Sequence, residues 1–218
     1  MRLKAVLTIA GSDSIGGAGI QADIKALMAN GVYAMSAVTA LTAQNTLGVT
    51  AIEEASTDFL AAEIDAVFED IRPDAVKIGM AASTALIRTI ADRLRAHRGE
   101  NIVLDPVMVA TSGARLLKED SIAALKSELF PLSTVITPNL PELALLSNGT
   151  LQSREERVAA AQKLSETWGC AVLAKGGHAA DADACDDILV ADGTVTAFPG
   201  ARIDTSTKIG RASCRERV

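Results

Sequence analysis

The sequence predicts an α/β protein whose central, mainly parallel β-sheet is covered by helices on both faces. Short apolar runs alternate with amphipathic segments of helical spacing along almost the whole chain, as in proteins built from repeated βα units. Hydrophobic residues make up 49% of the 218 positions and aromatic residues only 3%, so one large core can form from aliphatic side chains. No internal repeat or linker interrupts this pattern, and we expect a single domain over residues 1–208.

The apolar runs are predicted to be strands because they are short, bounded by polar or glycine-containing turns and apolar over nearly their whole length. The last apolar segment, Val190–Phe198, is interrupted by Asp192-Gly193 and predicts an antiparallel hairpin at an edge of the sheet. The other predicted strands are Ala5–Ala10, Tyr33–Leu41, Val49–Glu54, Ala75–Ile78, Ile102–Leu104, Val135–Thr137 and Ala171–Ala174.

The helices are predicted from apolar spacing and from residues that favour helix ends. Thr57 and Ser83 stand at expected N-caps, Ser153 precedes Glu156 at capping-box spacing, and Gly169 is placed as a C′ glycine. The predicted helices are Gly19–Ala29, Asp58–Phe68, Thr84–Ala96, Asp120–Leu129, Pro141–Ser147 and Glu155–Trp168.

Composition excludes several classes of partner. The net charge of −6 argues against a nucleic-acid or anionic-membrane surface as partner. The three cysteines form neither a disulfide framework nor a CxxC metal pair, which indicates a reducing cytoplasm. The apolar runs are shorter than the ~20 residues of a membrane span, and the first one is too short for a signal sequence. We therefore expect a cytoplasmic protein that does not enter a membrane.

The glycine-rich stretch Gly11–Lys25, GSDSIGGAGIQADIK, links the first predicted strand to the first helix. A turn at this place can present free backbone N–H groups at a helix N-terminus and so hold a polar or anionic ligand. The stretch matches neither the Walker A motif nor GxGxxG, and a tight βα connection without a ligand is the alternative. Asp23, one turn into the helix, favours the ligand site.

Polar loops recur after the predicted strands, whereas the opposite turns resemble plain surface connections. In an open α/β sheet, ligands bind outside the carboxyl ends of the strands, so this asymmetry indicates a binding face without specifying a reaction. The loops are Gly11–Gly19, Gln44–Thr46, Lys77–Met80, Asp105–Met108, Thr137–Glu142 and Lys175–His178.

Most of the candidate site residues in these loops also have a structural explanation. The amide of Gln44 suits the edge of an aminopyrimidine-like ring but can also cap a turn. Asp105 can hold Mg²⁺ through water or form an Asx-type turn. Asn139 and Glu142 can face one site, although Glu142 also suits the first turn of a helix. Lys77 is more simply a solvated or snorkelling side chain.

The fragment Lys175-Gly176-Gly177-His178 is more informative, because two glycines after a buried strand leave N–H groups open to phosphate while the lysine adds a charge. The two histidines, His97 and His178, have no metal-ligand partner at a useful spacing, so the sequence does not predict a zinc site.

Together these segments resemble a known family. GSDSIGGAGIQADIK, ALTAQNTLGV, VKIGM, DPVMVATSG, TPNLPE and AKGGH, in this order and spacing, are similar to hydroxymethylpyrimidine/phosphomethylpyrimidine kinases of thiamine biosynthesis, within the ribokinase superfamily. The resemblance covers Leu3 to about Thr207. It implies a three-layer α/β/α sandwich that uses ATP and Mg²⁺ to phosphorylate the pyrimidine hydroxymethyl group, and then the resulting monophosphate.

The resemblance also assigns site residues by position. Gln44 would pair with the aminopyrimidine and Asp23 would lie near its substituents, and Lys175 would be the catalytic residue at the ATP phosphates. The rest of the substrate pocket would comprise Gly11, Thr42, Met80 and Val107. The rest of the nucleotide site would comprise Asn139, Gly176 and Gly177, with Asp105 and Glu142 serving Mg²⁺.

The C-terminal part departs from the family pattern. Family members continue after a segment such as Ile203–Thr205 into GTGC, whose amides bind the transferring phosphoryl group, and then into helices; this sequence has neither. Ile209–Val218 resembles a sequencing-adapter read-through, so we expect residues 209–218 to be non-native and the kinase domain to be incomplete. From this we expect the chain to be marginally stable and nearly inactive.

Two alternatives stay open. A pyridoxal kinase uses the same scaffold and a similar ring, although Gln44 within QNT and Met80 favour the pyrimidine. A non-catalytic pyrimidine-binding protein would explain the missing GTGC. A nicotinamide dehydrogenase is disfavoured, because GxGxxG and the acidic residue for the ribose are both missing. The resemblance also allows a homodimer.

Overall fold

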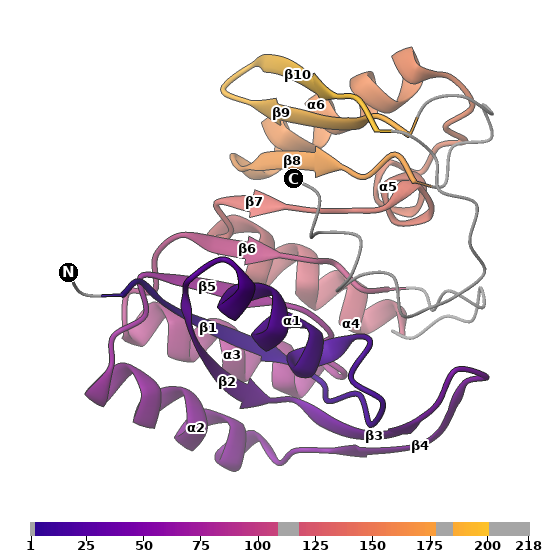
Figure 1. The fold of residues 1–218 in the computed structure, drawn as a ribbon. Coiled ribbons are helices and arrows are strands. Elements are labelled where there is room, and N and C mark those ends of the chain that lie inside the picture. The colour runs from indigo at the N-terminus through magenta and orange to yellow at the C-terminus, as the bar shows by residue number, and fades with distance from the viewer. Residues whose placement is uncertain (1–2, 109–117, 178–184, 201–218) are drawn as a thin grey trace.

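The computed structural model describes residues 3–108, 118–177 and 185–200, and Figure 1 shows them as a twisted sheet with helices on both faces. The expected domain of residues 1–208 therefore lies partly outside the described residues. Ile203–Thr205 and the expected non-native segment Ile209–Val218 lie wholly outside them.

The main sheet has eight strands in the order β10-β9-β8-β7-β6-β5-β1-β2. Neighbouring strands from β2 to β8 are parallel, whereas β9 and β10 form the predicted antiparallel hairpin at the edge. The strands are β1 (Ala5–Ala10), β2 (Tyr33–Val38), β5 (Ala75–Ile78), β6 (Ile102–Leu104), β7 (Val135–Ile136), β8 (Ala171–Ala174), β9 (Asp187–Ala191) and β10 (Thr194–Phe198). The mainly parallel sheet predicted from the sequence is confirmed.

The predicted strand Tyr33–Leu41 is two strands. β2 ends at Val38, and the chain leaves the main sheet at Thr39, which is fully buried and whose Oγ1 donates to the Met80 carbonyl at 2.6 Å. β3 (Ala40–Gln44) then pairs antiparallel with β4 (Val49–Glu54) in a separate two-stranded sheet. This pair, called the β3–β4 flap below, extends away from the body (Figure 1).

The helices follow the sequence prediction closely. They are α1 (Gly19–Ala29), α2 (Thr57–Asp70), α3 (Thr84–Ala96), α4 (Glu119–Ala124), α5 (Leu140–Ser147) and α6 (Arg154–Trp168). α1 lies in front of the sheet in Figure 1, and α2 and α3 lie behind it. The predicted helix Asp120–Leu129 instead changes at Leu125 into a π-helical turn, η1 (Leu125–Leu129), followed by the 3₁₀ turn η2 (Phe130–Leu132).

Helix caps agree with the sequence to within one residue. The N-cap of α2 is Ser56 rather than Thr57, and its side chain accepts the N–H of Phe59. The capping box of Ser153 and Glu156 is present at α6, and Gly169 ends that helix in the left-handed conformation. Side-chain caps of this kind satisfy N–H groups that the first turn of a helix leaves unpaired.

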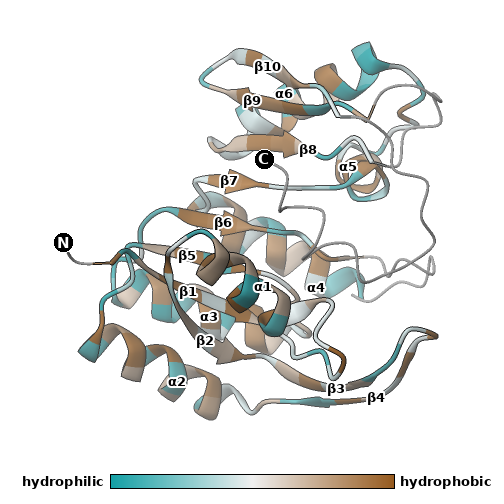
Figure 2. Cartoon of the chain, in the orientation of Figure 1, coloured by the Kyte–Doolittle hydropathy of each residue, from teal (hydrophilic) through white to brown (hydrophobic). Residues whose placement is uncertain are grey.

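The core is aliphatic, as the composition indicates, with Phe130 packed edge-on against Trp168 at a centroid distance of 4.6 Å. Figure 2 shows the hydrophobic colour concentrated on the central strands. Alternate residues of the parallel strands are fully buried, including Val76 and Ile78 on β5 and Ile102 and Leu104 on β6. Burial of alternate residues fixes the register of these strands, and with it the positions of the loops that follow them. Within the three described segments, no helix has both the length and the apolar character needed to cross a membrane.

Candidate functional site

Three of the predicted site residues meet where β6, β7 and β8 end. Asp105 follows β6, Asn139 follows β7 and Lys175 follows β8. Lys175 Nζ lies 2.9 Å from Asp105 Oδ1, in an ion pair that is about one-fifth to one-quarter exposed. Asn139 forms a parallel bridge with Lys175, whose N–H donates to the Pro138 carbonyl. Val107 lies two residues beyond Asp105 in the loop after β6 and is half-buried.

Glu142 is built into the N-terminus of α5 by a reciprocal capping box. Its Oε2 accepts the Asn139 N–H at 2.8 Å, and Asn139 Oδ1 accepts the Glu142 N–H at 2.9 Å. Only 2% of Glu142 is exposed. The pKa of its carboxyl is raised from 4.5 to about 7, chiefly by burial and also by the nearby Asp105 charge, and this rise is net of the opposing effects of Lys175 and of the backbone N–H groups of Asn139 and Met108. The site therefore holds an acid that titrates near neutral pH.

This titration predicts a pH dependence of stability. The pKa of Glu142 in the folded chain exceeds the ordinary value of 4.5, so folding favours the protonated carboxyl. Its contribution to the free energy of unfolding is therefore fully present below pH 4.5 and is lost as pH rises through about 7. Glu142→Gln keeps the capping geometry but does not titrate. Between pH 4.5 and 8 the free energy of unfolding of the unaltered chain should fall relative to the glutamine variant by on the order of 3 kcal/mol.

Chemical denaturation of both proteins across this pH range measures the difference directly. Glu63 also has a raised pKa, but it is present in both proteins and cancels from the comparison. A difference that does not change with pH would contradict the assignment of the titrating acid to Glu142.

Asp105 and Glu142 are the carboxylates that could serve Mg²⁺. Mg²⁺ is usually held by one or two carboxylates together with substrate phosphates and water. Asp105 fits this role because it is partly exposed, while Glu142 is buried with one oxygen already bonded to a backbone N–H. Within the described residues no group of three or more His, Cys, Asp or Glu could hold a metal ion.

The glycine-rich turn differs from the sequence prediction. Three of its N–H groups are not free, because the Asp13 carboxylate accepts those of Gly17 at 3.0 Å and Ala18 at 2.8 Å through Oδ2, and that of Ile15 at 3.2 Å through Oδ1. Asp13 itself is 3% exposed. The expectation that these amides hold an anionic ligand is therefore wrong, since a side chain of the turn occupies them.

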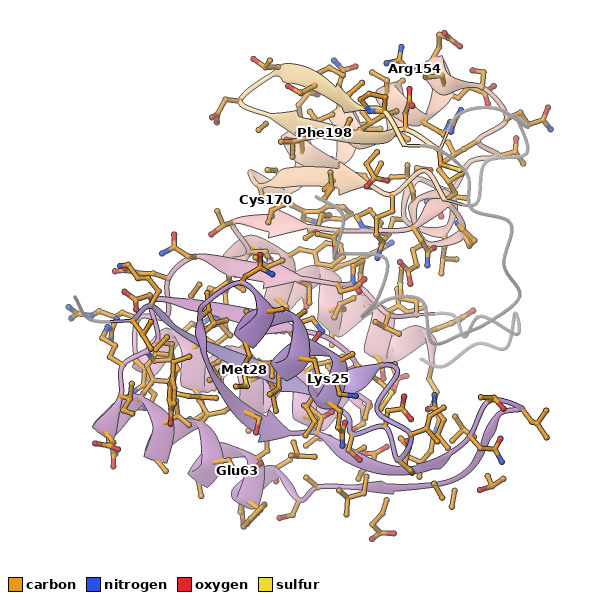
Figure 3. All side chains as sticks on the ribbon, viewed as in Figure 1. Lys25, Met28, Glu63, Arg154, Cys170 and Phe198 are labelled. Carbon is orange, nitrogen blue, oxygen red and sulfur yellow. The ribbon has the colours of Figure 1, made fainter. Side chains whose placement is uncertain are left out.

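Side chains of α1 complete the bracing of this turn. Gln21 Oε1 accepts the Asp13 N–H at 2.8 Å, and Lys25 Nζ donates to the Gly16 carbonyl at 2.9 Å. Lys25 is labelled on α1 in Figure 3. Gly19 has a φ of +59°, and a Cβ there would lie 2.3 Å from the Gly11 carbonyl oxygen. This close approach of two backbone segments requires glycine.

The structure brings together four of the residues predicted to bind the ring. A Cβ on Gly11 would lie 2.5 Å from the Met80 Cε, so the Met80 side chain covers this glycine. Thr42 of β3 is bonded to the neighbouring Ser12, because its Oγ1 donates to the Ser12 carbonyl at 2.7 Å. Gln44 lies at the end of the same strand.

Asp23 has hydrogen-bond partners that the sequence did not predict. Its Oδ2 accepts hydrogen bonds from Thr8 Oγ1 at 2.7 Å and from Lys77 Nζ at 2.6 Å. The simple explanation of Lys77 as a solvated side chain is therefore wrong: it forms a partly buried ion pair between β5 and α1. Its position at a strand end of the binding face was the signal that could have identified it.

The glycines after Lys175 differ from each other. The Gly176 N–H donates to Asp187 Oδ1 at 2.7 Å, and a Cβ on Gly176 would lie 2.1 Å from the Asp186 carbonyl oxygen. The expectation that this N–H is open to phosphate is wrong, and close packing explains the glycine. Gly177 is exposed, with open space around its Cα.

Both groups of residues lie along one edge of the sheet. Gly11 and Met80 follow β1 and β5, Asp23 on α1 is bonded to side chains of both strands, and the ion pair of Lys175 and Asp105 lies just after β8 and β6. Four neighbour spacings of ~4.8 Å separate β1 from β8, a width of roughly 19 Å. An arrangement of this width can hold a small ring at one end and a chain of phosphates at the other.

The family model described as phosphomethylpyrimidine kinase matches residues 13–214. The hydroxymethylpyrimidine/phosphomethylpyrimidine kinase of Rhizobium meliloti (strain 1021) is 50% identical over 205 residues, which cover 94% of this chain and 76% of the relative.

Two solved structures show the same fold. The crystal structure of a phosphomethylpyrimidine kinase from Clostridium difficile 630 has a TM-score of 0.84 at 42% identity, covering 91% of this chain and 85% of that one. An ADP complex of Bacillus subtilis pyridoxal kinase has a TM-score of 0.86 at 31% identity, covering 97% of this chain and 85% of that one. The scaffold alone therefore does not distinguish a pyrimidine from a pyridoxal substrate.

Proposed function

The chain belongs to the phosphomethylpyrimidine kinase family, and on this premise we propose that it phosphorylates 4-amino-5-hydroxymethyl-2-methylpyrimidine and its monophosphate with the γ-phosphoryl group of ATP, within thiamine biosynthesis. The observation that carries the proposal is that Asp23, bonded to side chains of β1 and β5, and the ion pair of Lys175 with Asp105, which follow β8 and β6, belong to one main sheet. A ring held by Asp23 and Gln44 would then lie next to the phosphates, as transfer between them requires.

At the ring end, the Gln44 amide supplies both a donor and an acceptor for the aminopyrimidine edge. Asp23 uses Oδ2 for Thr8 and Lys77, which leaves Oδ1 to accept a hydrogen bond from the substrate. Met80 and Val107 pack against the ring. Gly11 and the backbone of Thr42 complete the pocket.

At the phosphate end, Lys175 is the catalytic residue. Its ammonium has three donors, so it can contact the transferring phosphoryl group while retaining Asp105. Asn139 and the backbone at Gly177 add polar contacts to the nucleotide. A bound Mg²⁺ near Asp105 and Glu142 would neutralise phosphate charge. Phosphoryl transfer depends mainly on such alignment and charge neutralisation rather than on covalent chemistry by the protein.

Two further expectations accompany this function. We propose a cytoplasmic enzyme without nucleic-acid or membrane partners, supported by the net charge of −6 and by free cysteines at positions 170 and 185. The resemblance also allows a homodimer. We also expect low turnover, because the sequence lacks GTGC. A coupled assay of ADP release measures this, and ordinary kinase turnover would contradict it.

The alternative is a pyridoxal kinase, favoured by the fold likeness to the Bacillus subtilis enzyme. The two functions differ at Gln44, whose amide matches an aminopyrimidine edge. A non-catalytic pyrimidine-binding protein would bind the ring and release no ADP.

Replacing Gln44 by alanine should test ring recognition. Loss of a buried donor and acceptor pair costs about 1–3 kcal/mol, so the dissociation constant of the pyrimidine should rise by roughly tenfold to a hundredfold. Binding of a non-hydrolysable ATP analogue should not change. Titration calorimetry measures both ligands, with Gln152→Ala, an exposed glutamine ahead of α6, as control. Equal pyrimidine affinity in the two variants would remove Gln44 from the site.

A further inference from the structure

The glycine-rich turn runs beside β3 and is bonded to every second residue of that strand. The Ser12 N–H donates to the Ala40 carbonyl at 2.8 Å, and Ser12 Oγ accepts the Thr42 N–H at 3.3 Å. Ser14 Oγ donates to the Thr42 carbonyl at 2.5 Å and accepts the Gln44 N–H at 3.1 Å. The two serines thus occupy the edge of β3 that β4 leaves open.

The opposite edge of β3 is irregular at the same place. The register between β3 and β4 shifts between Ala43 and Gln44, which leaves Thr50 as an extra residue on β4. Thr50 Oγ1 donates to the Ala43 carbonyl at 3.0 Å. A β-bulge of this kind redirects the side chains beside it, so the direction of the Gln44 side chain depends on how its backbone is held on both edges.

Packing contributes little to holding this part of the flap. All six residues of β4 are exposed, and Leu47 at the tip is 91% exposed. The turn on the other side is firmly braced, because the buried Asp13 carboxylate accepts three backbone N–H groups. Hydrogen bonds from the braced turn are therefore what fixes the end of β3.

We propose that Ser14 is a positioning residue for ring recognition: its hydroxyl fixes the backbone of Gln44 and so orients the side-chain amide of Gln44 toward the substrate. This inference rests on the proposed function, in which Gln44 pairs with the ring. It gives the serines of the GSDS segment a role that differs from the anion-binding role predicted for the turn. Ser14 acts through Gln44 and does not itself contact the reacting atoms.

Calorimetry on variants of the whole chain tests the proposal. Ser14→Ala should weaken binding of 4-amino-5-hydroxymethyl-2-methylpyrimidine by roughly threefold to tenfold, the effect of losing one hydrogen bond that water partly replaces. Ser14→Thr keeps the hydroxyl and should bind as the unaltered chain does. Affinity for a non-hydrolysable ATP analogue should be unchanged. Ser127→Ala is the matched control. Ser127 is an exposed residue on η1, and its hydroxyl donates to the carbonyl of Ala124 at the end of α4.

A double variant separates positioning from a general structural effect. If Ser14 acts only through Gln44, adding Ser14→Ala to Gln44→Ala should cause no further loss of pyrimidine affinity. An additive loss, a parallel loss of ATP-analogue binding, or a Ser14→Ala variant that binds the pyrimidine normally would each overturn the inference. Failure of the unaltered chain to bind the pyrimidine would instead overturn the proposed function, and the inference with it.

Discussion

Replacing Asp13 by alanine should lower the free energy of unfolding by about 2–5 kcal/mol, because it leaves backbone N–H groups of the glycine-rich turn without an acceptor. Each buried donor left unsatisfied costs about 1–3 kcal/mol. Asp13 serves three such groups, and those of Gly17 and Ala18 share one of its oxygens. Chemical denaturation at pH 7 measures the loss.

Two further variants make this test specific. Asp13→Asn retains an acceptor oxygen but not the charge, and should fall between the alanine variant and the unaltered chain. Glu166→Ala, an exposed acid on α6, should change stability by less than about 0.5 kcal/mol. An Asp13→Ala variant as stable as the Glu166→Ala control would show that the turn does not depend on its internal carboxylate.

Replacing Lys175 by methionine should abolish the low pyrimidine-dependent ADP release of the unaltered chain, because removing one group that stabilises developing charge in a transition state costs ~10²–10³-fold in rate. The variant also removes the lysine that pairs with the Asp105 carboxylate, so the ATP phosphates would lie near an unpaired negative charge. Affinity for ATP should therefore fall as well. Pyrimidine affinity should not fall, because the ring lies at the other end of the sheet edge.

Lys163→Met is the matched control, since Lys163 is an exposed lysine on α6. Single-turnover measurements of ADP release separate the chemical step from product release. If Lys175→Met and Lys163→Met bind a non-hydrolysable ATP analogue equally tightly, Lys175 has no role at the phosphates. Equal losses of pyrimidine and ATP affinity would indicate that the change disturbs the whole sheet edge.

The sequence predicted the main sheet because buried parallel strands are apolar throughout and glycine and capping residues mark their ends. It failed at Thr39, where apolar character continues from β2 into β3 although the two strands belong to different sheets. Side-chain periodicity does not report which partner a strand pairs with. The departure at Thr39 depends on a hydroxyl bonded to the Met80 carbonyl, a contact across 41 positions.

Site residues were predicted by the rule that ligands lie at the carboxyl ends of parallel strands. Asp105 and Lys175 do follow β6 and β8 of the parallel sheet, whereas Gln44 ends β3 in the separate two-stranded sheet. Their partners were not predictable in the same way. Lys77 pairs with Asp23 across 54 positions, and Lys175 with Asp105 across 70. Such pairs are set by strand order, which one sequence does not reveal.

The glycine-rich turn shows a different limit of sequence analysis. Glycines indicate where backbone comes close to something, but not whether that is a ligand or the protein itself. At Gly19 it is the Gly11 carbonyl, and at Gly176 it is the backbone of Asp186. Asp13 was the available signal, because a carboxylate just before a glycine-rich helix start can accept the N–H groups otherwise offered to an anion.

The most direct test of the account is titration calorimetry of the unaltered chain with 4-amino-5-hydroxymethyl-2-methylpyrimidine and, separately, with pyridoxal. If Gln44, Asp23 and Met80 form the ring end of the site, the pyrimidine should bind at least about tenfold more tightly than pyridoxal. The reason is that the Gln44 amide supplies both a donor and an acceptor that match the aminopyrimidine edge. Equal or tighter binding of pyridoxal, or no binding of either compound, would contradict it.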